Sequence, residues 1–437
     1  MTRRDPLLLA LVLGLVPGAV RAQRAPDLAE PSPFIDAVGG LGLDEAITRA
    51  RMHEPSLQAV RHDVDVARGR RDQSGARPNP STSLEIRGEP GGTDSLVSIG
   101  VQWPLELFRR SGRIATADQQ VGVAELAAAD RERTLDGAVR MQYGRAAAAI
   151  REAQVAAVLA DTVERQVAAV RARIDEGETP RLDGDLLEVE LRRLRGQRDL
   201  AEGRAERAML ALKPLLGLSA EEPLALRESI ETLVGARTAS VAPQRPAGGA
   251  ERADVRQAAQ QVSVAAAAID RAEREGRFDV GLFGSYMRMD AGFPQLGFAP
   301  AGGVERVRAQ FHYVSGGITV MLPLLNRNQG DVAAARAEHA ASTARQQATE
   351  LAARAEIAAA TVRDRWARQA LTAYDTSTHD LARRNLDVVR QTFELGRATV
   401  YEVLAEQRRY LEFEQAYTAA LLEAWEAHAD LRRAVGE

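Results

Sequence analysis

The segment Val97-Ser-Ile-Gly-Val-Gln-Trp-Pro104-Leu-Glu-Leu and the segment Gly317-Ile-Thr-Val-Met-Leu-Pro323-Leu-Leu follow one plan, an alternating stretch that ends in proline. Each leads into a long stretch without proline, at residues 105–179 and 324–437. The repetition indicates a chain of two similar halves. Each half is predicted to join short amphipathic strands to helical segments of about 65 residues, roughly 100 Å long. Rods of that length suit a conduit across a wide aqueous compartment better than a compact domain.

A first β-hairpin is predicted at residues 81–103, with strands at 81–87 and 95–103 around a glycine-rich turn. Side chains of a strand point alternately to its two faces. One face of the second strand is therefore apolar, and the other is nearly neutral and polar. The apolar side chains are Val97, Ile99, Val101 and Trp103, and those opposite are Ser98, Gly100 and Gln102.

The second half repeats this order. A helix from about residue 254 to 276 precedes a second hairpin at 278–322, whose strands at 278–288 and 306–322 flank a long loop. That loop is expected at 289–305. The second hairpin therefore has the longer connection of the two.

Composition and charge narrow the classes of protein. The formal net charge is -4, so no basic surplus exists to neutralise phosphates, and nucleic acid is not an expected partner. A signal peptide for secretion is predicted at residues 1–22, and an extended leader at 23–42. The absence of cysteine excludes disulfides and a lipid-bearing N-terminal cysteine. Since no apolar run of about 18 residues occurs, a membrane location would require β-barrel strands.

Long helices fill most of the chain. The first repeat is predicted at 43–213, beginning with a helix at 43–75 that Pro55 kinks. The second repeat is predicted at 251–437, and the proline-rich connector between them, at 214–250, is expected outside the packed rods. Apolar residues at steps of four and three predict coiled-coil packing. These residues include Leu159, Val163, Val167, Val170, Leu187, Leu191, Leu194 and Leu212.

Each long rod is interrupted at a corresponding glycine. Gly177 and Gly396 are separated by the same number of residues as Pro104 and Pro323. Glycine is the usual residue just after a helix end, because it adopts a left-handed conformation without strain. The chain is therefore expected to turn back near residues 177 and 396, and each rod becomes a helical hairpin.

A closure argument links these pieces to a pore. Each chain supplies about four strands, too few to form a barrel alone. Two copies would give eight strands, whose interior side chains fill, whereas three would give twelve and leave a lumen. Strands of about 9 to 11 residues match a tilted crossing of an outer membrane. Pro104 and Pro323 mark the strand–helix junctions.

The sequence resembles the TolC-like outer-membrane efflux family over nearly all of the mature chain. Five features carry the resemblance: Glu54-Pro-Ser-Leu57, Ala76-Arg-Pro-Asn-Pro80, Trp103-Pro-Leu-Glu-Leu107, Leu322-Pro-Leu-Leu-Asn-Arg-Asn-Gln-Gly330, and the glycine pair Gly177 and Gly396. The run ending at Gly330 is most similar to the CzcC branch, whose members work with heavy-metal cation pumps. The order of these motifs and their repetition are more specific than any one motif.

The resemblance implies a mainly α fold with a small β part. Long coiled-coil helical hairpins would form a tunnel through the periplasm, and four strands per chain would join a twelve-stranded trimeric barrel in the outer membrane. Such a homotrimer would be a passive exit duct for solutes, metal cations on the branch resemblance. Its expected partners are outer-membrane lipid, a periplasmic adaptor and an inner-membrane RND-type pump.

The resemblance also assigns candidate site residues. In relatives, acidic residues past the second tip glycine ring the narrow periplasmic entrance, and the matching position here is Glu402. A second acidic position of the family falls on Ala405, which departs from the pattern. Asp183 or Asp185 occupies the comparable place in the first half. A solvated charge at a helix end is the alternative interpretation of Glu402.

The helix tips themselves are candidates for adaptor docking. They contain Gly177 and Thr179 in the first half, and Gly396, Arg397 and Thr399 in the second. An arginine near a helix end also interacts favourably with the helix dipole without any partner. Both interpretations stay open from the sequence alone.

Other functions find less support. The six histidines are scattered without metal-ligand spacing, and no nucleophile turn or phosphate loop occurs, so no metal site, cofactor or enzyme activity is expected. Within the channel class, a drug-efflux or type I secretion duct is the alternative to metal export. A soluble periplasmic coiled-coil adaptor, or a structural coiled-coil protein of the envelope, would not need two alternating hairpins with proline at their ends.

Overall fold

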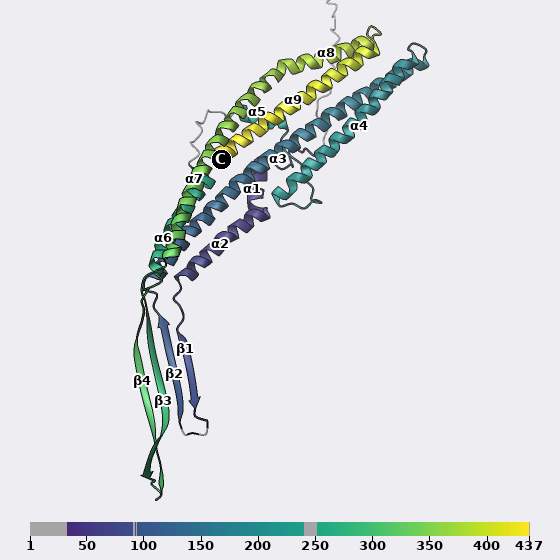
Figure 1. Ribbon diagram of the computed structural model, residues 1–437. Coiled ribbons are helices and arrows are strands. Elements are labelled where there is room, and N and C mark those ends of the chain that lie inside the picture. Colours follow the sequence, from purple (N-terminus) through teal and green to yellow (C-terminus); the bar gives the residue numbers. More distant parts are fainter. Residues whose placement is uncertain (1–32, 91, 93, 240–250, 437) are drawn as a thin grey trace, which may run out of the picture.

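The computed structural model describes residues 33–90, 92, 94–239 and 251–436, and it shows long helices with a β-sheet at one end (Figure 1). The predicted signal peptide, the first half of the predicted leader and the end of the predicted connector lie outside the described residues. None of the helices in the described part is both long and apolar enough to cross a lipid bilayer.

The sheet contains strands from both halves. Its order is β1 (Ser81–Gly88), β2 (Ser95–Pro104), β3 (Asp279–Phe298) and β4 (Val304–Met321), and all neighbouring pairs are antiparallel. The central pair, β2 and β3, joins the two halves of the chain. The outer edges of β1 and β4 have no strand partner within this sheet.

The two faces of the sheet differ in the way that the sequence of β2 predicts. Ile99 lies between Leu84 and Tyr286, and Tyr286 is opposite Val314, so one face is apolar across all four strands. This face is bare within one chain, since Leu84 is 68% exposed and Val314 is 85% exposed. The opposite face contains a shallow pocket of about 410 Å³ among small and polar side chains such as Ser83, Gly100 and Ser285.

The predicted loop at 289–305 is wrong. The strands β3 and β4 continue through it to a short turn, where Gly302 has a φ of +79°. The register between β3 and β4 shifts only between Gly292 and Leu296. Ladder pairing thus overrides a glycine-rich composition that indicates a loop in isolation. The second hairpin is a ribbon that extends beyond β1 and β2 (Figure 1).

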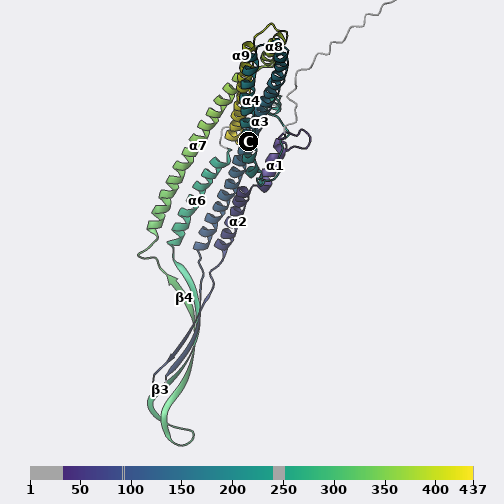
Figure 2. The ribbon, with the colours of Figure 1, turned by 90° about the vertical axis from the view of Figure 1, so that its right-hand side faces the viewer.

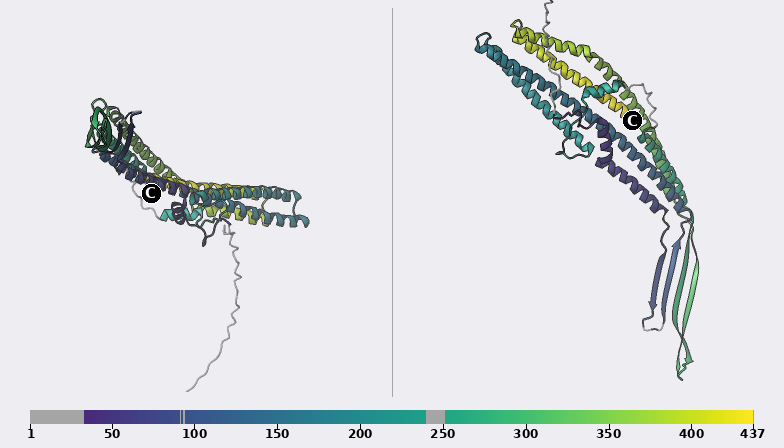
Figure 3. Two further views of the ribbon diagram at one scale, coloured as in Figure 1. Left: turned by 90° about the horizontal axis from the view of Figure 1, so that it is seen from below. Right: turned by 180° about the vertical axis from the view of Figure 1, so that it is seen from behind.

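The helices form a curved wall beyond the sheet (Figures 2 and 3). Near the sheet the wall consists of α2, α3, α6 and α7, and near the far end of α4, α3, α9 and α8. The bounds are α1 (Leu43–His53), α2 (Pro55–Gly75), α3 (Arg109–Asp175), α4 (Arg181–Leu212), α5 (Ile230–Ala239), α6 (Ala253–Glu275), α7 (Gln329–Leu371), α8 (Thr376–Glu394) and α9 (Val400–Val435), with short 3-10 helices η1 (Lys213–Leu216) and η2 (Thr372–Tyr374).

Two helix predictions need correction. The helix expected at 43–75 is two helices, because Pro55 takes the first position of α2 and Glu54 caps it. The Glu54 side chain accepts a bond from the Leu57 amide at 2.6 Å. In the second half the long rod is interrupted by η2, and Asp375 caps the following helix. Only the rod of the first half, α3, is one unbroken helix.

The described part of the predicted connector, residues 214–239, is not outside the packed rods as expected. Leu216, Leu226 and Ile230 are fully buried against α1 and α3. Part of the predicted leader joins them, because the Leu226 amide donates to Phe34 O at 2.8 Å and the Leu41 amide donates to Ala225 O at 2.8 Å. The apolar residues between the prolines thus form a small packed layer on the side of the wall.

The long helices pack through the predicted seams. The apolar residues of α3 and α4 that the heptad pattern selects are buried, and α9 adds Val400, Leu404 and Leu411 to the same cluster. Closer to the sheet, Gly144 of α3 faces Trp425 of α9. A Cβ atom at residue 144 would lie 2.0 Å from Trp425 Cδ1. The indole is 5% exposed and donates to Arg140 O at 2.8 Å, so it is held in place.

Replacement of Gly144 by alanine should therefore destabilise the packing of α3 on α9. We expect Gly144→Ala to lower the free energy of unfolding by about 1–3 kcal/mol, because the added methyl group has no room. Gly69→Ala on α2 is the matched control, since nothing lies within 4 Å of its Cβ position and alanine favours helix. Denaturant melts of both purified variants test this, and equal stability of the two would contradict it.

Candidate functional site: the helical tips and the seam between the hairpins

The first tip is closed by the hydrogen bonds of a Schellman motif. The Gly177 amide donates to Ile174 O at 3.0 Å, and the Glu178 amide donates to Arg173 O at 2.9 Å. Gly177 has a φ of +78°, which explains the glycine, and nothing lies within 4 Å of its Cβ position. Pro180 then precedes α4 as its N-cap, and Thr179 is half-buried beside it. The tip is exposed and sharply turned.

The second tip uses the same motif. The Gly396 amide donates to Phe393 O at 2.8 Å, and the Arg397 amide donates to Thr392 O at 2.9 Å. The Gly396 φ is +72°. Arg173 of the first tip donates from Nη2 to Glu394 O at 2.6 Å, so the two hairpin ends are joined directly. The structure therefore places the predicted tip residues of both halves at one end of the molecule.

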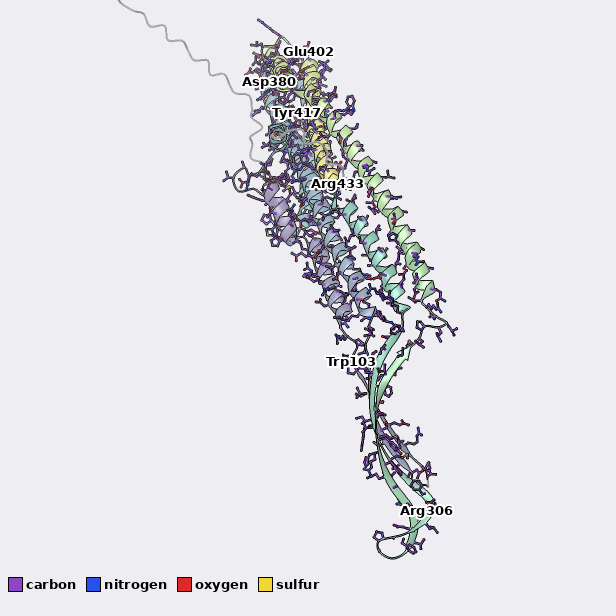
Figure 4. All side chains as sticks on the ribbon, turned by 90° about the vertical axis from the view of Figure 1, so that its left-hand side faces the viewer. Trp103, Arg306, Asp380, Glu402, Tyr417 and Arg433 are labelled. Atoms are coloured by element: carbon purple, nitrogen blue, oxygen red, sulfur yellow. The ribbon has the colours of Figure 1, made fainter. Side chains whose placement is uncertain are left out.

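Glu402 lies in the first turn of α9, at the end of the wall farthest from the sheet (Figure 4). Its carboxylate accepts from the Thr399 amide at 2.7 Å, while its own amide donates to Thr399 Oγ1 at 3.3 Å. These reciprocal bonds form a capping box. The backbone bond from Thr399 lowers the pKa of Glu402 below its usual range. The carboxylate is exposed and ionised, and it also stabilises the first turn of α9.

Asp183 and Asp185 also lie at this end, in the first turns of α4. Asp183 is half-buried and Asp185 is exposed. Within the described residues no hydrogen bond or ion pair connects either aspartate with Glu402. The carboxylates of one chain are therefore separate, and a ring of them at an entrance stays a prediction.

A polar seam between the two hairpins escaped the sequence analysis. Gln407 of α9 donates from Nε2 to Gln166 Oε1 of α3 at 2.7 Å, and both side chains are buried. Nearby, Arg408 of α9 lies 3.4 Å from Glu190 of α4. Burial alone would raise the pKa of Glu190, but hydrogen bonds and charge from Arg193 and Arg408 outweigh it and lower the pKa. Gln407 occupies a position of the heptad pattern that is usually apolar. The apolar heptad residues around it are therefore the only signal in the sequence that could have indicated its burial.

A buried ionic cluster lies farther from the tips, where four helices meet. Arg151 of α3 donates to Glu414 of α9 at 2.8 Å, and it also contacts Glu231 of α5 and Thr418. His379 Nε2 of α8 lies 2.9 Å from Glu414 Oε1. The side chains of Arg151 and Glu414 are 4% and 1% exposed. Through His379 the cluster links the margin helix α8 to the body of the wall.

The strand–helix junctions differ between the halves. After Pro104, the Leu105 amide continues the ladder to Val280 O at 2.9 Å, and Glu106 then turns the chain with a φ of +48°. An ion pair with 2.6 Å between Arg113 Nη2 and Glu106 Oε2 stabilises this turn. After Pro323, the chain reaches α7 through Asn328, whose φ is +60°.

Other chemistry finds no visible support. In the described part of the chain no group of three or more His, Asp or Glu side chains could hold a metal ion. The cavity beside Glu414, about 450 Å³, lies between α3, α4 and α9 and is lined by Glu152, Arg204 and Thr418, among others.

Comparisons with known proteins agree on one family. The sequence model of the family described as outer membrane efflux protein matches residues 46–218 and 249–437. No curated protein sequence matches the chain. Several solved structures share its fold, and at these low identities the likeness concerns the fold alone.

Three of these structures illustrate the likeness. A membrane protein from Pseudomonas aeruginosa has 21% identity and a TM-score of 0.72, over 90% of this chain and 92% of its own. CusC has 18% identity and a TM-score of 0.72, with 90% and 92% covered. The outer membrane protein VceC from Vibrio cholerae has 17% identity and a TM-score of 0.67, with 90% and 96% covered.

The ionic cluster predicts a specific pH dependence. Burial would raise the pKa of Glu414, but His379 and Arg151 outweigh it and lower this pKa from 4.5 to about 2. A depressed carboxyl pKa contributes stability that is complete above about pH 4.5 and is lost as the pH falls through about 2. In denaturant melts across this range, the free energy of unfolding of wild type should exceed that of Glu414→Gln by roughly a few kcal/mol at neutral pH. The difference should vanish towards pH 2. A constant difference would contradict this account.

Proposed function

Because this chain belongs to the outer membrane efflux protein family, we propose that three copies close into a trimeric duct through which solutes leave across the outer membrane. The open sheet carries this proposal. β1 and β4 each leave a row of backbone groups unpaired, and a bilayer offers no water to satisfy them. Three copies of a four-stranded sheet would give a barrel of twelve strands with a lumen.

The two margins of the chain support closure in a ring. One margin carries β1, α2 and α4, and the other carries β4, α7 and α8. A contact between two different margins is heterologous, and it forms a closed ring when the rotation between copies is right. The apolar face of the sheet would then face lipid, and the face with Ser83 and Ser285 would line the lumen.

The helical margins carry matching apolar stripes. On α4 the stripe is Leu182, Val189 and Gly196. On the other margin it is Val388 and Leu381 of α8 with Leu395, the residue that caps the end of α8. Each stripe moves away from the tips in steps of seven residues, so residues of one level could meet. Val189 is 67% exposed and Val388 is 59% exposed within one chain. Gly196 has nothing within 4 Å, which leaves room for a large side chain such as Leu381 of a neighbouring copy.

The proposal extends to partners and solute. The tips would project into the periplasm and meet a periplasmic adaptor connected to an inner-membrane RND-type pump. The residues proposed to make this contact are the exposed Gly177, Gly396, Arg397 and Thr399 and the half-buried Thr179. The pump would supply the energy, so the duct itself needs no catalytic group. Metal cations are the proposed solute, supported by the motif that ends at Gly330 and by the ionised carboxylate of Glu402.

The ring can be tested with cysteines, because the natural chain has none. In the double variant Val189→Cys with Val388→Cys, oxidation or a short bismaleimide should link neighbouring copies into a covalent trimer. The two residues lie on opposite margins of one chain, so a link within a chain is not expected. The matched control pairs Val189→Cys with Val66→Cys, an exposed residue of α2. If only monomers appear on denaturing gels of the outer-membrane fraction, the ring is wrong.

Glu402 offers a test of the entrance. Glu402→Gln keeps an oxygen that can accept the bond from Thr399, but it removes the charge. We expect a lower preference for cations over anions in planar-bilayer conductance, because a narrow throat with fewer negative charges holds fewer cations. Asp63→Asn, which removes an exposed carboxylate of α2 far from the tips, is the matched control and should not alter selectivity. Unchanged selectivity of Glu402→Gln would remove this residue from the entrance.

The solute itself is tested in cells. Loss of the protein should increase sensitivity to divalent transition-metal ions if it serves a cation pump. Increased sensitivity to drugs and detergents alone would instead favour a drug-efflux duct with the same architecture.

A further inference from the structure

The apolar face of the sheet ends at a defined level. Going away from the helices along β4, its outward residues are Val320, Ile318 and Val314, and His312 follows at the level of Arg288 on β3. About eight residue steps, roughly 27 Å of strand before tilt, thus separate Val320 from His312. This length suits the apolar band of an outer-membrane barrel, which is about 25 Å tall.

Two arginines without an ion-pair partner lie beyond that level. Arg306 and Arg308 are exposed on β4, and within the described residues no carboxylate lies within 4 Å of either guanidinium. They follow His312 at even steps along β4, on the side of the strand that carries Val314 and Ile318. The acidic neighbour Glu305 alternates to the other side. Figure 4 shows Arg306 near the end of the ribbon, far from Trp103.

The assembled barrel would leave these arginines accessible. The edge of β4 would face β1 of another copy, but β1 has 8 residues and β4 has 18. The neighbour can therefore cover less than half of β4, and the ribbon beyond the common end of the sheet stays uncovered. Arg308 lies about 13 Å along the strand from His312. Since strands tilt and long arginine side chains bend back towards an interface, the guanidinium reaches the headgroup layer.

We propose that Arg306 and Arg308 bind the phosphate groups of phosphorylated lipid headgroups in the outer leaflet. The proposal rests on the proposed membrane barrel. A guanidinium is always charged and presents paired donors that match a phosphate, so it is better suited to this ligand than to neutral lipid. Arg288, which lies 3.4 Å from Asp290, sits at the inner boundary of the same surface. Three copies would carry three such surfaces around the barrel.

The test uses purified trimers and fluorescent lipid A with two phosphates. The double variant Arg306→Gln with Arg308→Gln should bind this lipid about thirtyfold more weakly than wild type, since each arginine near a lipid surface contributes about 1 kcal/mol. Lipid A with one phosphate should bind wild type more weakly, and free inorganic phosphate should not compete at millimolar concentration. Competition by free phosphate would show an anion site that does not need lipid.

The matched control is Arg70→Gln with Arg256→Gln, which removes two exposed arginines of α2 and α6 and should bind lipid A as wild type does. Equal binding by the Arg306 and Arg308 variant overturns the inference. Insertion of every variant into vesicles as a heat-modifiable trimer is measured first. Failure of wild type to insert would overturn the proposed barrel and this inference together, whereas insertion with unchanged lipid binding would overturn this inference alone.

Discussion

The unpaired edges of β1 and β4 are the constraint on which the rest of the structure depends. A four-stranded sheet with one bare apolar face is stable neither in water, where that face is exposed, nor in lipid, where its edges lack hydrogen-bond partners. In the proposed ring, other copies of the same chain would satisfy both conditions at once. The helices obey the same geometry, because α4 and α8 present their exposed stripes at the margins that continue from β1 and β4.

The two helical tips, at the end of the wall farthest from the sheet, are subject to a different constraint. Two helical hairpins must stop and reverse in water without a covering domain, and both do so with a left-handed glycine that lets the last carbonyl groups find donors within the turn. The Thr399 and Glu402 pair does the same for the first amides of α9. The tips are therefore complete as local structures. Their exposed residues are free to contact another molecule without loss of the turn itself.

A feature of this fold could be predicted from the sequence when the residues that form it lie close together in the chain. The tips, the long helix α3 and the apolar face of β2 depend on neighbours close in sequence, and these predictions are confirmed. The length of β3 and β4 depends on ladder bonds between residues 289–298 and 304–312, which composition does not reveal. The burial of Leu226 likewise depends on Phe34 and Leu41, nearly 200 residues away in sequence. The candidate carboxylates were placed near the tips, but the sequence did not show that Asp183 and Asp185 are separate from Glu402 within one chain, because this depends on how the two hairpins pack.

The two halves, although duplicated, differ in the continuity of their long rod. The first half runs from β2 to its tip through a single helix of 67 residues, and α3 contacts α2, α4, α6 and α9 along that length. In the second half the corresponding rod is broken at η2 into α7 and α8. None of the residues of α8 is buried. The contacts that hold α8 include that of His379 with Glu414, the bond from Arg173 to Glu394 O, and the packing of Phe393 on the cluster of α3, α4 and α9. Tyr374 and His379 also pack on Phe413 and Tyr417. α8 lies at a margin and carries exposed apolar side chains such as Leu381 and Val388. In the proposed ring the next copy would cover them, and the shape of the far end would then depend on the assembly.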